Sequence, residues 1–324
     1  MITVFVHRNG TTESLSELDP ALLQPGSGAK VWVDLAGASQ SELRILSDVF
    51  HFHPLAVEDA VAALHHPKIE AYNGYLYLIL HGIDYQKSRD EESFITHDTD
   101  FFLGPNYLVT IHDGQTRSIT GIQDVCGRND HVLGEGPGAL MHRIIDRMVD
   151  NYRPEIEQLE KWLDELEREV FDVPKKETVR EILSVKQDVT ALRRISTPQR
   201  DAIGRLARRE FPLIPEELTF RFRDVYDNLV RIADEGLIFQ DRITSLLDAH
   251  YSNVSNRLNE IMRVLTVITV IVSPLTLVAG IYGMNMRLPL VGSDSDPRPF
   301  WWLVGGMVAT VVIMLGFFRK KDWL

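Results

Sequence analysis

Two long runs near the C-terminal end of the sequence contain no charged residue, from Leu265 to Met286 and from Phe300 to Phe318. A helix needs about 20 apolar residues to cross the hydrocarbon core of a bilayer, and each run is close to that length. A pair of buried core helices is the alternative, which charge-free runs of this length disfavour. We therefore predict two transmembrane helices, at about 262–282 and 300–318, in a membrane domain at 262–324.

The N-terminal part of the chain shows a different pattern, in which short strand-like and helix-like segments alternate. Strand character marks residues 2–6, 30–35, 75–80, 94–103 and 107–111. Helical spacing marks 39–50 and 53–64, with Ser39 or Ser41 as the candidate N-cap. This mixture predicts an α/β domain at 1–137. The Gly-rich stretch at 134–138 lacks the Lys-Ser/Thr of a phosphate loop, so we interpret it as a linker.

Long helical patterns follow the linker. One helix is expected over 139–171, with a kink or break at Pro154, and a second from about Lys176. The third begins after Pro215 and, if it continues to Tyr282, is about 100 Å long at ~1.5 Å per residue. We interpret it as a stalk that leaves the cytoplasm and enters the membrane as the first span.

Charge separates the same regions. The formal net charge of −12 is composed of −15 before Arg257 and +3 from Arg257 onward. An acidic chain of this kind is not expected to bind nucleic acid. The single cysteine, Cys126, rules out an intrachain disulfide and fits a reducing cytosol. Walker A, nucleophile-elbow and HExxH motifs are missing from the sequence, so we expect a protein that is not an enzyme.

Basic residues flank the two spans unevenly. Five lie on the side of the chain ends and two lie in the loop between the spans. The five are Arg257, Arg263, Arg319, Lys320 and Lys321, and the two are Arg287 and Arg298. Because cytoplasmic flanks carry the excess of Lys and Arg, we predict a multi-pass protein of the cytoplasmic (inner) membrane with both termini in the cytoplasm.

Mostly small or polar residues recur at alternating steps of three and four along the third helix. They are Ser245, Asp248, Ser252, Ser255, Asn259, Met262, Thr266, Thr269, Ser273, Thr276 and Gly280, which we call the polar seam. A 3.5-residue repeat keeps such a stripe on one side of a helix in a left-handed bundle. The seam serves either close helix packing or the lining of an aqueous pore. The pore requires an oligomer, because two helices per chain cannot enclose one.

The third helix ends in Tyr282-Gly283-Met284-Asn285, which resembles the signature of the CorA family of divalent-cation channels. Other segments similar to that family are Asn259–Met262, Pro274–Thr276, the basic tail Lys320–Leu324, His53–Leu55 with Glu58-Asp59, His66–Lys68 and Phe222–Asp227. The likeness therefore covers almost the whole chain. One departure is Arg287 in the loop after the signature, where the family often has an acidic residue.

The resemblance implies a homopentameric funnel, with the α/β cytoplasmic domain followed by long stalk helices at 138–261 and two C-terminal transmembrane α-helices. It implies passive uptake of Mg²⁺, with Co²⁺ and Ni²⁺ as further cargo. By matching position, Gly283, Met284 and Asn285 select the ion, and Gly280, Thr276 and Asn259 line its path. Met262 and Leu265 would form an apolar gate, although Leu265 is not part of the polar seam.

The resemblance also implies that cytoplasmic Mg²⁺ bound between subunits closes the pore. Asp59 and Asp224 from different subunits would hold this ion, with Glu58 and Asp146 contributing nearby. A bound divalent ion neutralises the repulsion between these carboxylates and so favours the closed assembly. Mg²⁺ is thus expected both as cargo and as regulator, without an organic cofactor, and the expected partners are other copies of the chain, the bilayer and divalent cations.

Two other functions remain open. The first is Zn²⁺ transport of the related ZntB type, and the second is a membrane-anchored sensor that conducts no ions. The pairs His51/His53 and His65/His66 suggest a zinc site, but neither has the i, i+4 spacing that would place both rings on one helix face. We interpret these histidines as loop residues with local hydrogen bonds.

Overall fold

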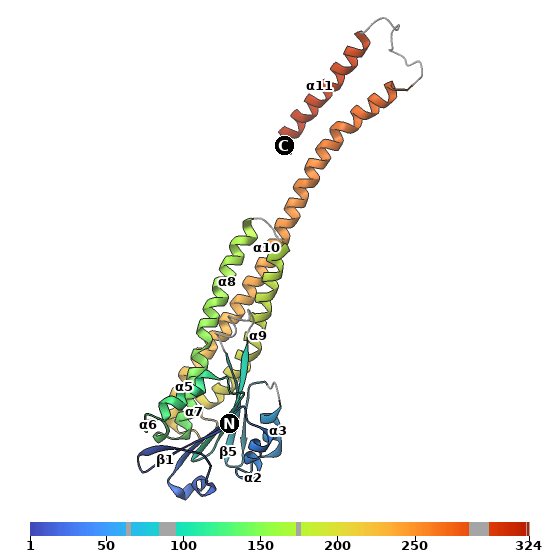
Figure 1. Ribbon diagram of the computed structural model, residues 1–324. Helices are drawn as coiled ribbons and strands as arrows, with labels where there is room; N and C mark the ends of the chain where they lie inside the picture. The colour runs from blue at the N-terminus through green and yellow to red at the C-terminus, as the bar shows by residue number, and fades with distance from the viewer. Residues whose placement is uncertain (63–65, 84–94, 173–175, 285–297, 322, 324) are drawn as a thin grey trace. The chain divides into compact units, whose positions relative to one another are not determined.

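The computed structural model describes residues 1–62, 66–83, 95–172, 176–284, 298–321 and 323. It contains two compact units (Figure 1). The first comprises Met1–Glu169 and Lys175–Leu247, and the second comprises Val170–Pro174 and Asp248–Leu324.

A seven-stranded sheet forms the centre of the first unit, in the order β2-β1-β3-β7-β6-β5-β4. The strands are β1 Ile2–Arg8, β2 Thr11–Leu15, β3 Lys30–Ala36, β4 Lys68–Tyr72, β5 Tyr75–Ile83, β6 Thr96–Leu103 and β7 Tyr107–His112. Every neighbouring pair is antiparallel except β3 and β7, which run parallel. The five predicted strands are confirmed. The sequence analysis missed β2 and β4, which lie at the two edges and carry weaker apolar patterns because their outer sides are solvated.

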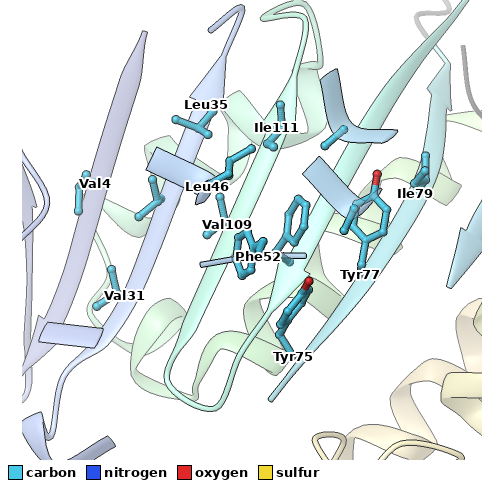
Figure 2. Close-up of a cluster of buried hydrophobic side chains, with 14 of the residues drawn as sticks. Val4, Val31, Leu35, Leu46, Phe52, Tyr75, Tyr77, Ile79, Val109 and Ile111 are labelled. Carbon is cyan, nitrogen blue, oxygen red and sulfur yellow. The ribbon is translucent and has the colours of Figure 1, made fainter. Parts of the chain in front are cut away.

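One face of the sheet holds the hydrophobic core shown in Figure 2. Alternate residues of the central strands, such as Val31, Leu35 and Val109, point to this face because successive side chains in a strand alternate. The Phe52 ring stacks on Phe102 with ring centroids 4.2 Å apart. Burial of each such side chain contributes roughly 1.5–3 kcal/mol, so this face anchors the segment that carries Phe52.

Short helices cover that face: α1 Gln40–Leu43, α2 Ile45–Asp48 and α3 Pro54–Val61. Ser39 caps α1 in a capping box with Glu42, which confirms one of the two candidate N-caps. The single helix predicted over 39–50 is wrong, because the chain forms two one-turn helices there. Two short 3₁₀ helices, η1 Pro20–Leu23 and η2 Pro25–Ser27, precede β3.

The opposite face of the sheet is covered by helices that the sequence analysis did not separate (Figure 1). They are α5 Arg117–Cys126, α6 His131–Gly134 and α7 Pro137–Asp150. The expected linker at 134–138 is a short connection between α6 and α7, in which Gly136 adopts φ 120°. A residue with a Cβ is strained in that conformation, which explains the glycine.

Three long helices follow: α8 Tyr152–Asp172, α9 Lys176–Ala207 and α10 Glu216–Tyr282. The predicted start after Pro215 and the end at Tyr282 are confirmed. The break expected at Pro154 lies instead at Asn151, between α7 and α8. Proline lacks an N–H and clashes with the carbonyl four residues earlier, so it is accommodated in the first turn of a helix. The break therefore precedes Pro154 and places it in the first turn of α8.

The second unit contains the C-terminal part of α10 from Asp248 and the helix α11 Arg298–Lys320. Among the described residues, α10 and α11 are the helices long and apolar enough to cross a membrane. In the most apolar 18-residue segment of each helix, only 6% of the residues of α10 and 0% of those of α11 are buried. The core helix of a soluble protein would be mostly buried. This exposure favours the membrane interpretation over the alternative of buried core helices.

Candidate functional site

The membrane segment of α10 presents one hollowed face in which several predicted pathway residues lie together. A shallow depression is lined by Ser273, Thr276, Leu277, Gly280, Ile281 and Met284. Thr276, Gly280 and Met284 are four residues apart, so they follow one another along a single side of the helix. The structure thus places three of the predicted pore residues, with Ser273 of the polar seam, on one surface of the second unit.

The threonines of the polar seam have a defined hydrogen-bond orientation. The hydroxyl groups of Thr266, Thr269 and Thr276 donate to the carbonyl oxygens of the residues four positions earlier, at 2.7, 2.8 and 2.9 Å. A hydroxyl has one proton and two lone pairs, so each oxygen is left as an acceptor toward its surroundings. Water bound to a cation donates hydrogen bonds outward, and the free acceptor sites of the threonine oxygens can receive them.

The space around the two glycines near the end of α10, Gly280 and Gly283, differs. A Cβ at Gly283 would lie 3.1 Å from the carbonyl oxygen of Ala279, so a larger residue would crowd the last turn. A Cβ at Gly280 meets nothing within 4 Å. The chain itself therefore favours a small residue at 283 and places no such limit at 280.

The helix ends at Tyr282, the first residue of the signature. The Gly283 N–H donates to Ala279 at 2.9 Å and the Met284 N–H donates to Ile281 at 3.3 Å. Asn285 and the loop residue Arg287 lie outside the described residues. The predicted role of Asn285 therefore stays a prediction from the signature.

The two residues predicted to form a gate are apolar and exposed. Met262 is 57% exposed and Leu265 is 54% exposed, and Asn259, one turn before Met262, is exposed as well. Residues three apart lie on neighbouring positions of one helix side. The structure therefore allows Met262 and Leu265 to act together, although only Met262 belongs to the polar seam.

In the first unit, the predicted sensor residue Asp59 already has a cationic partner. The Lys68 ammonium lies 2.5 Å from the Asp59 carboxylate and 3.1 Å from Glu70. Burial alone would lower the pKa of Lys68, but its hydrogen bonds to Asp59 and Glu70 outweigh burial and raise it. Glu58, the preceding residue on α3, is exposed. Sequence reasoning noted Lys68 only as part of a motif and did not identify it as the partner of Asp59.

The other two predicted sensor residues form a second pair. Asp146 on α7 is half-buried, and Asp224 on α10 is exposed. Burial raises the pKa of Asp146, and so do the negative charges of Asp150 and Asp224, while His142 opposes the change. The structure therefore brings Asp146 and Asp224 within electrostatic reach of each other and leaves Glu58 and Asp59 together on α3.

These two acidic pairs do not assemble a metal site in one chain. Within the residues that the structure describes, no three His, Cys, Asp or Glu side chains converge on a position for a metal ion. His51 and His53 each make a local hydrogen bond through Nδ1. His51 Nδ1 bonds the Ser47 carbonyl at 2.9 Å, and His53 Nδ1 accepts from the Leu55 N–H at 3.2 Å, which confirms the local role expected of them. His65 lies outside the described residues.

Comparison with known proteins decides the family. The family model described as "CorA-like Mg²⁺ transporter protein" matches residues 27–320. The chain belongs to the CorA-like Mg²⁺ transporter family. Proteins of this CorA family are membrane transporters of divalent cations, not enzymes, and the two candidate spans of this chain fit that class.

Curated relatives and solved structures agree with this assignment. The chain is 32% identical to the putative metal ion transporter YfjQ of Bacillus subtilis, over 90% of this chain and 89% of that protein. It is also 32% identical to the cobalt/magnesium transport protein CorA of Thermotoga maritima, over 92% and 84%. The fold matches the CorA magnesium transporter of Methanocaldococcus jannaschii with a TM-score of 0.83 at 22% identity, over 100% of this chain and 99% of that one. This likeness confirms the predicted fold class.

Proposed function

We propose that this CorA-family chain carries Mg²⁺ inward across the cytoplasmic membrane, with Co²⁺ and Ni²⁺ as further cargo. The main support for this proposal is one face of α10, where Ser273, Thr276, Gly280 and Met284 line a depression that leads to the signature Gly283-Met284-Asn285. The 32% identity to a protein named for cobalt and magnesium transport supports the choice of ions.

The transporting form is a homopentamer of this chain with both termini in the cytoplasm. Each chain supplies one polar face on α10, and several such faces are needed to enclose a pathway. The open space around Gly280 supports this arrangement, because a neighbouring helix or the pathway itself would occupy it. In this assembly 1–137 and 138–261 form the cytoplasmic funnel and 262–324 forms the membrane domain.

Ion passage uses neutral oxygen atoms that accept hydrogen bonds from the water around Mg²⁺. Mg²⁺ dehydrates reluctantly and is commonly bound through retained waters. The oriented hydroxyls of Thr266, Thr269 and Thr276, and a ring of Asn285 side-chain amides, would meet those waters without the tight hold of a carboxylate. Met262 and Leu265 would close the path by excluding water from an apolar constriction.

Cytoplasmic Mg²⁺ closes the pathway by binding between subunits. Asp59 of one subunit and Asp224 of its neighbour hold the ion, with Glu58 and Asp146 beside them. Two features support an interface site: the described residues of one chain assemble no metal site, and the mutual repulsion around Asp146 and Asp224 would be relieved by a cation. Mg²⁺ must also compete with Lys68 for Asp59.

The test is ion flux into proteoliposomes that contain the purified full-length chain. We expect Mg²⁺ influx that falls as the internal Mg²⁺ concentration is raised. Parallel measurements with Co²⁺, Ni²⁺ and Zn²⁺, with and without a proton gradient, decide the cargo. Zn²⁺ flux that follows the proton gradient, with little Mg²⁺ flux, would replace this proposal by transport like that of the 23%-identical zinc transport protein ZntB of Yersinia enterocolitica. Absence of flux for every ion would favour a non-conducting sensor.

A further inference from the structure

A cavity of about 260 Å³ in the first unit is lined by none of the residues assigned above to transport or sensing. Its wall is formed by the start of α5, the end of α7 and the beginning of α8, together with the ends of β5 and β6; α5 and α7 pack side by side (Figure 1). The polar side chains in the wall are His97, Gln115, Thr116, Arg117, Ser118, Arg147 and Asn151.

The cavity is positively charged in an acidic protein. Arg117 and Arg147 line it, and no Asp or Glu side chain does so among the described residues. Neither arginine has an ion pair or hydrogen bond in the part of the chain that the structure describes. The Arg147 guanidinium lies against α5, with its Nη2 atom 3.0 Å from the position that a Cβ on Gly121 would take. Two unpaired guanidinium groups therefore flank one small cavity.

The first turn of α5 adds backbone donors. The first N–H groups of a helix have no acceptor inside the helix, and the partial positive charge there attracts anions. Thr116 stands at the N-cap, yet its side chain makes no capping hydrogen bond. Asn151 donates to the Ser118 hydroxyl at 2.9 Å, which leaves the Ser118 proton available as a donor at the same end of the helix.

Two buried side-chain atoms in the wall lack a hydrogen-bond partner, and they are a second indication of a ligand beside the helix N-terminus. Thr116 is 4% exposed and His97 is 8% exposed. Within the described residues, the Thr116 Oγ1 and His97 Nε2 atoms are buried without a hydrogen bond. The other ring nitrogen of His97, Nδ1, bonds the Asp113 carboxylate, whose second oxygen accepts from the Gln115 N–H at 2.9 Å. A buried polar atom without a partner is costly, so a bound group that supplies partners to both atoms is favoured.

We propose that this cavity binds a phosphate group, either as inorganic phosphate or as a small phosphate monoester. A doubly charged tetrahedral oxyanion matches two guanidinium groups, which bind phosphate in a bidentate manner, and it accepts hydrogen bonds from several directions at once. Thr116, Ser118 and the N–H groups of α5 donate to it, and His97 Nε2 contacts it as a further polar partner. The cavity is larger than a bare phosphate and smaller than the ~300–1,000 Å³ typical of drug-sized ligands, which leaves room for a short organic substituent.

The proposal is tested by isothermal titration calorimetry on the full-length chain in detergent, with inorganic phosphate as one titrant and glycerol phosphate as the other. We expect saturable binding of one molecule per chain by at least one of them, and the stronger titrant identifies the source of the phosphate group. Arg147→Gln and Arg117→Gln are each expected to weaken binding at least about tenfold, because each removes a charged hydrogen bond. Arg128→Gln, in the exposed turn that follows α5, is the matched control and should bind as the parent does.

Thr116→Val distinguishes a ligand site from a merely structural role. Valine keeps the shape of threonine and removes a buried hydroxyl without a partner, so the melting temperature should not fall. Phosphate binding should nevertheless weaken several-fold. Binding that does not saturate at millimolar phosphate, or equal losses in Arg128→Gln and Arg147→Gln, would overturn the proposal. So would unchanged binding in Thr116→Val together with both arginine variants.

Discussion

In the first unit the buried carboxylate of Asp34 accepts hydrogen bonds from three side chains, whereas in the second unit the threonine hydroxyls of α10 donate to carbonyls of their own helix. Gln123 donates to Asp34 at 2.7 Å, His112 Nε2 lies at 3.2 Å, and the Thr110 hydroxyl completes the set. Thr276, by contrast, bonds Val272 at 2.9 Å and is exposed. The Asp34 network of the first unit is therefore closed within one chain, whereas Thr276 of the second unit keeps an exposed oxygen that can accept further hydrogen bonds.

The same contrast separates the apolar side chains. The core beside the sheet is closed around Phe52, Val33 and Phe102, all of them buried. On α10, Met262 and Leu265 each expose more than half of their surface, and so do other large apolar residues such as Ile268. A soluble protein does not leave so many large apolar residues exposed unless a membrane or a partner covers them. Substitutions should consequently affect stability in the first unit and transport in the second.

The largest effect is expected from Asp34→Ala. Removal of the carboxylate leaves the buried donors of Thr110 and His112, and the half-buried amide of Gln123, without their acceptor, at a cost of about 3–5 kcal/mol. Chemical denaturation of the chain in detergent, followed by circular dichroism, measures the loss. Asp34→Asn keeps the shape and should cost less. Equal stability of Asp34→Ala and the parent would show that the network does not hold the sheet together.

Asn285→Ala is expected to lower Mg²⁺ influx at least about tenfold. The substitution removes the proposed ring of Asn285 side-chain amides, one from each subunit, whose oxygen atoms would accept hydrogen bonds from the water around Mg²⁺. The melting temperature should stay the same, in contrast to Asp34→Ala. Asn256→Ala, which lies on α10 outside the polar seam, is the matched control and should transport normally. Normal influx in Asn285→Ala would contradict both the pathway and the proposed function.

Met262→Ser should raise Mg²⁺ influx several-fold at high internal Mg²⁺, because a polar ring wets a constriction that an apolar ring keeps dry. Ile261→Ser is a close control, since Ile261 is 56% exposed and Met262 is 57% exposed, but they lie on different sides of α10. A similar rise in both variants would mean that general loosening of the helix, and not the gate, controls flux.

Lys68→Gln removes the cation that competes for Asp59. Partly exposed ion pairs contribute up to about 1 kcal/mol, so the Mg²⁺ concentration that protects the cytoplasmic region from proteolysis should fall about two- to fivefold. Lys186→Gln, which changes an exposed lysine on α9, should leave that concentration unchanged. A higher Mg²⁺ requirement in Lys68→Gln would indicate that Lys68 supports the sensor instead of competing with its ion.

The smallest expected effect is the pH dependence of stability that arises from Glu155 on α8. Burial, with the nearby negative charge of Asp188, raises the pKa of Glu155 to about 7. The unfolded value is about 4.3, so the folded chain holds this proton more tightly, and the resulting stability is full below the unfolded pKa and lost as pH rises through about 7. Glu155→Gln should therefore raise the melting temperature by about 2–4 °C at pH 8 and change it little at pH 4. The exposed Glu165→Gln should show no such difference. An equal effect at both pH values would assign it to packing.

Much of the fold could be predicted because its signals are local. Pro215 marks the start of α10, and the charge-free run after Leu265 identifies the span. Ser39 was one of two candidate N-caps in the sequence, and the structure selects it through its capping box with Glu42. The break at Asn151 was misplaced by three residues, because the pattern shows where a proline stands but not which side of it the helix ends.

In the candidate site, only those features could be predicted that join residues close together in the sequence. The polar seam identified the face of Thr276 and Gly280, since residues on one helix side follow from the helix period alone. The partner of Asp59 was not predictable. Lys68 stands on a neighbouring strand, and only the packing of α3 beside β4 brings their charges to 2.5 Å.

By itself the sequence determined which two segments are long and apolar enough to cross a membrane, which side of α10 is polar and which family signature stands at the end of that helix. These properties depend on residues within a few turns of one another, so composition and spacing suffice. Only the tertiary structure decided the sheet order with its parallel β3–β7 pair, the closed network around Asp34 and the cavity lined by Arg117 and Arg147. Each of these joins residues distant along the chain, and their meeting is set by the packing of the helices on the sheet.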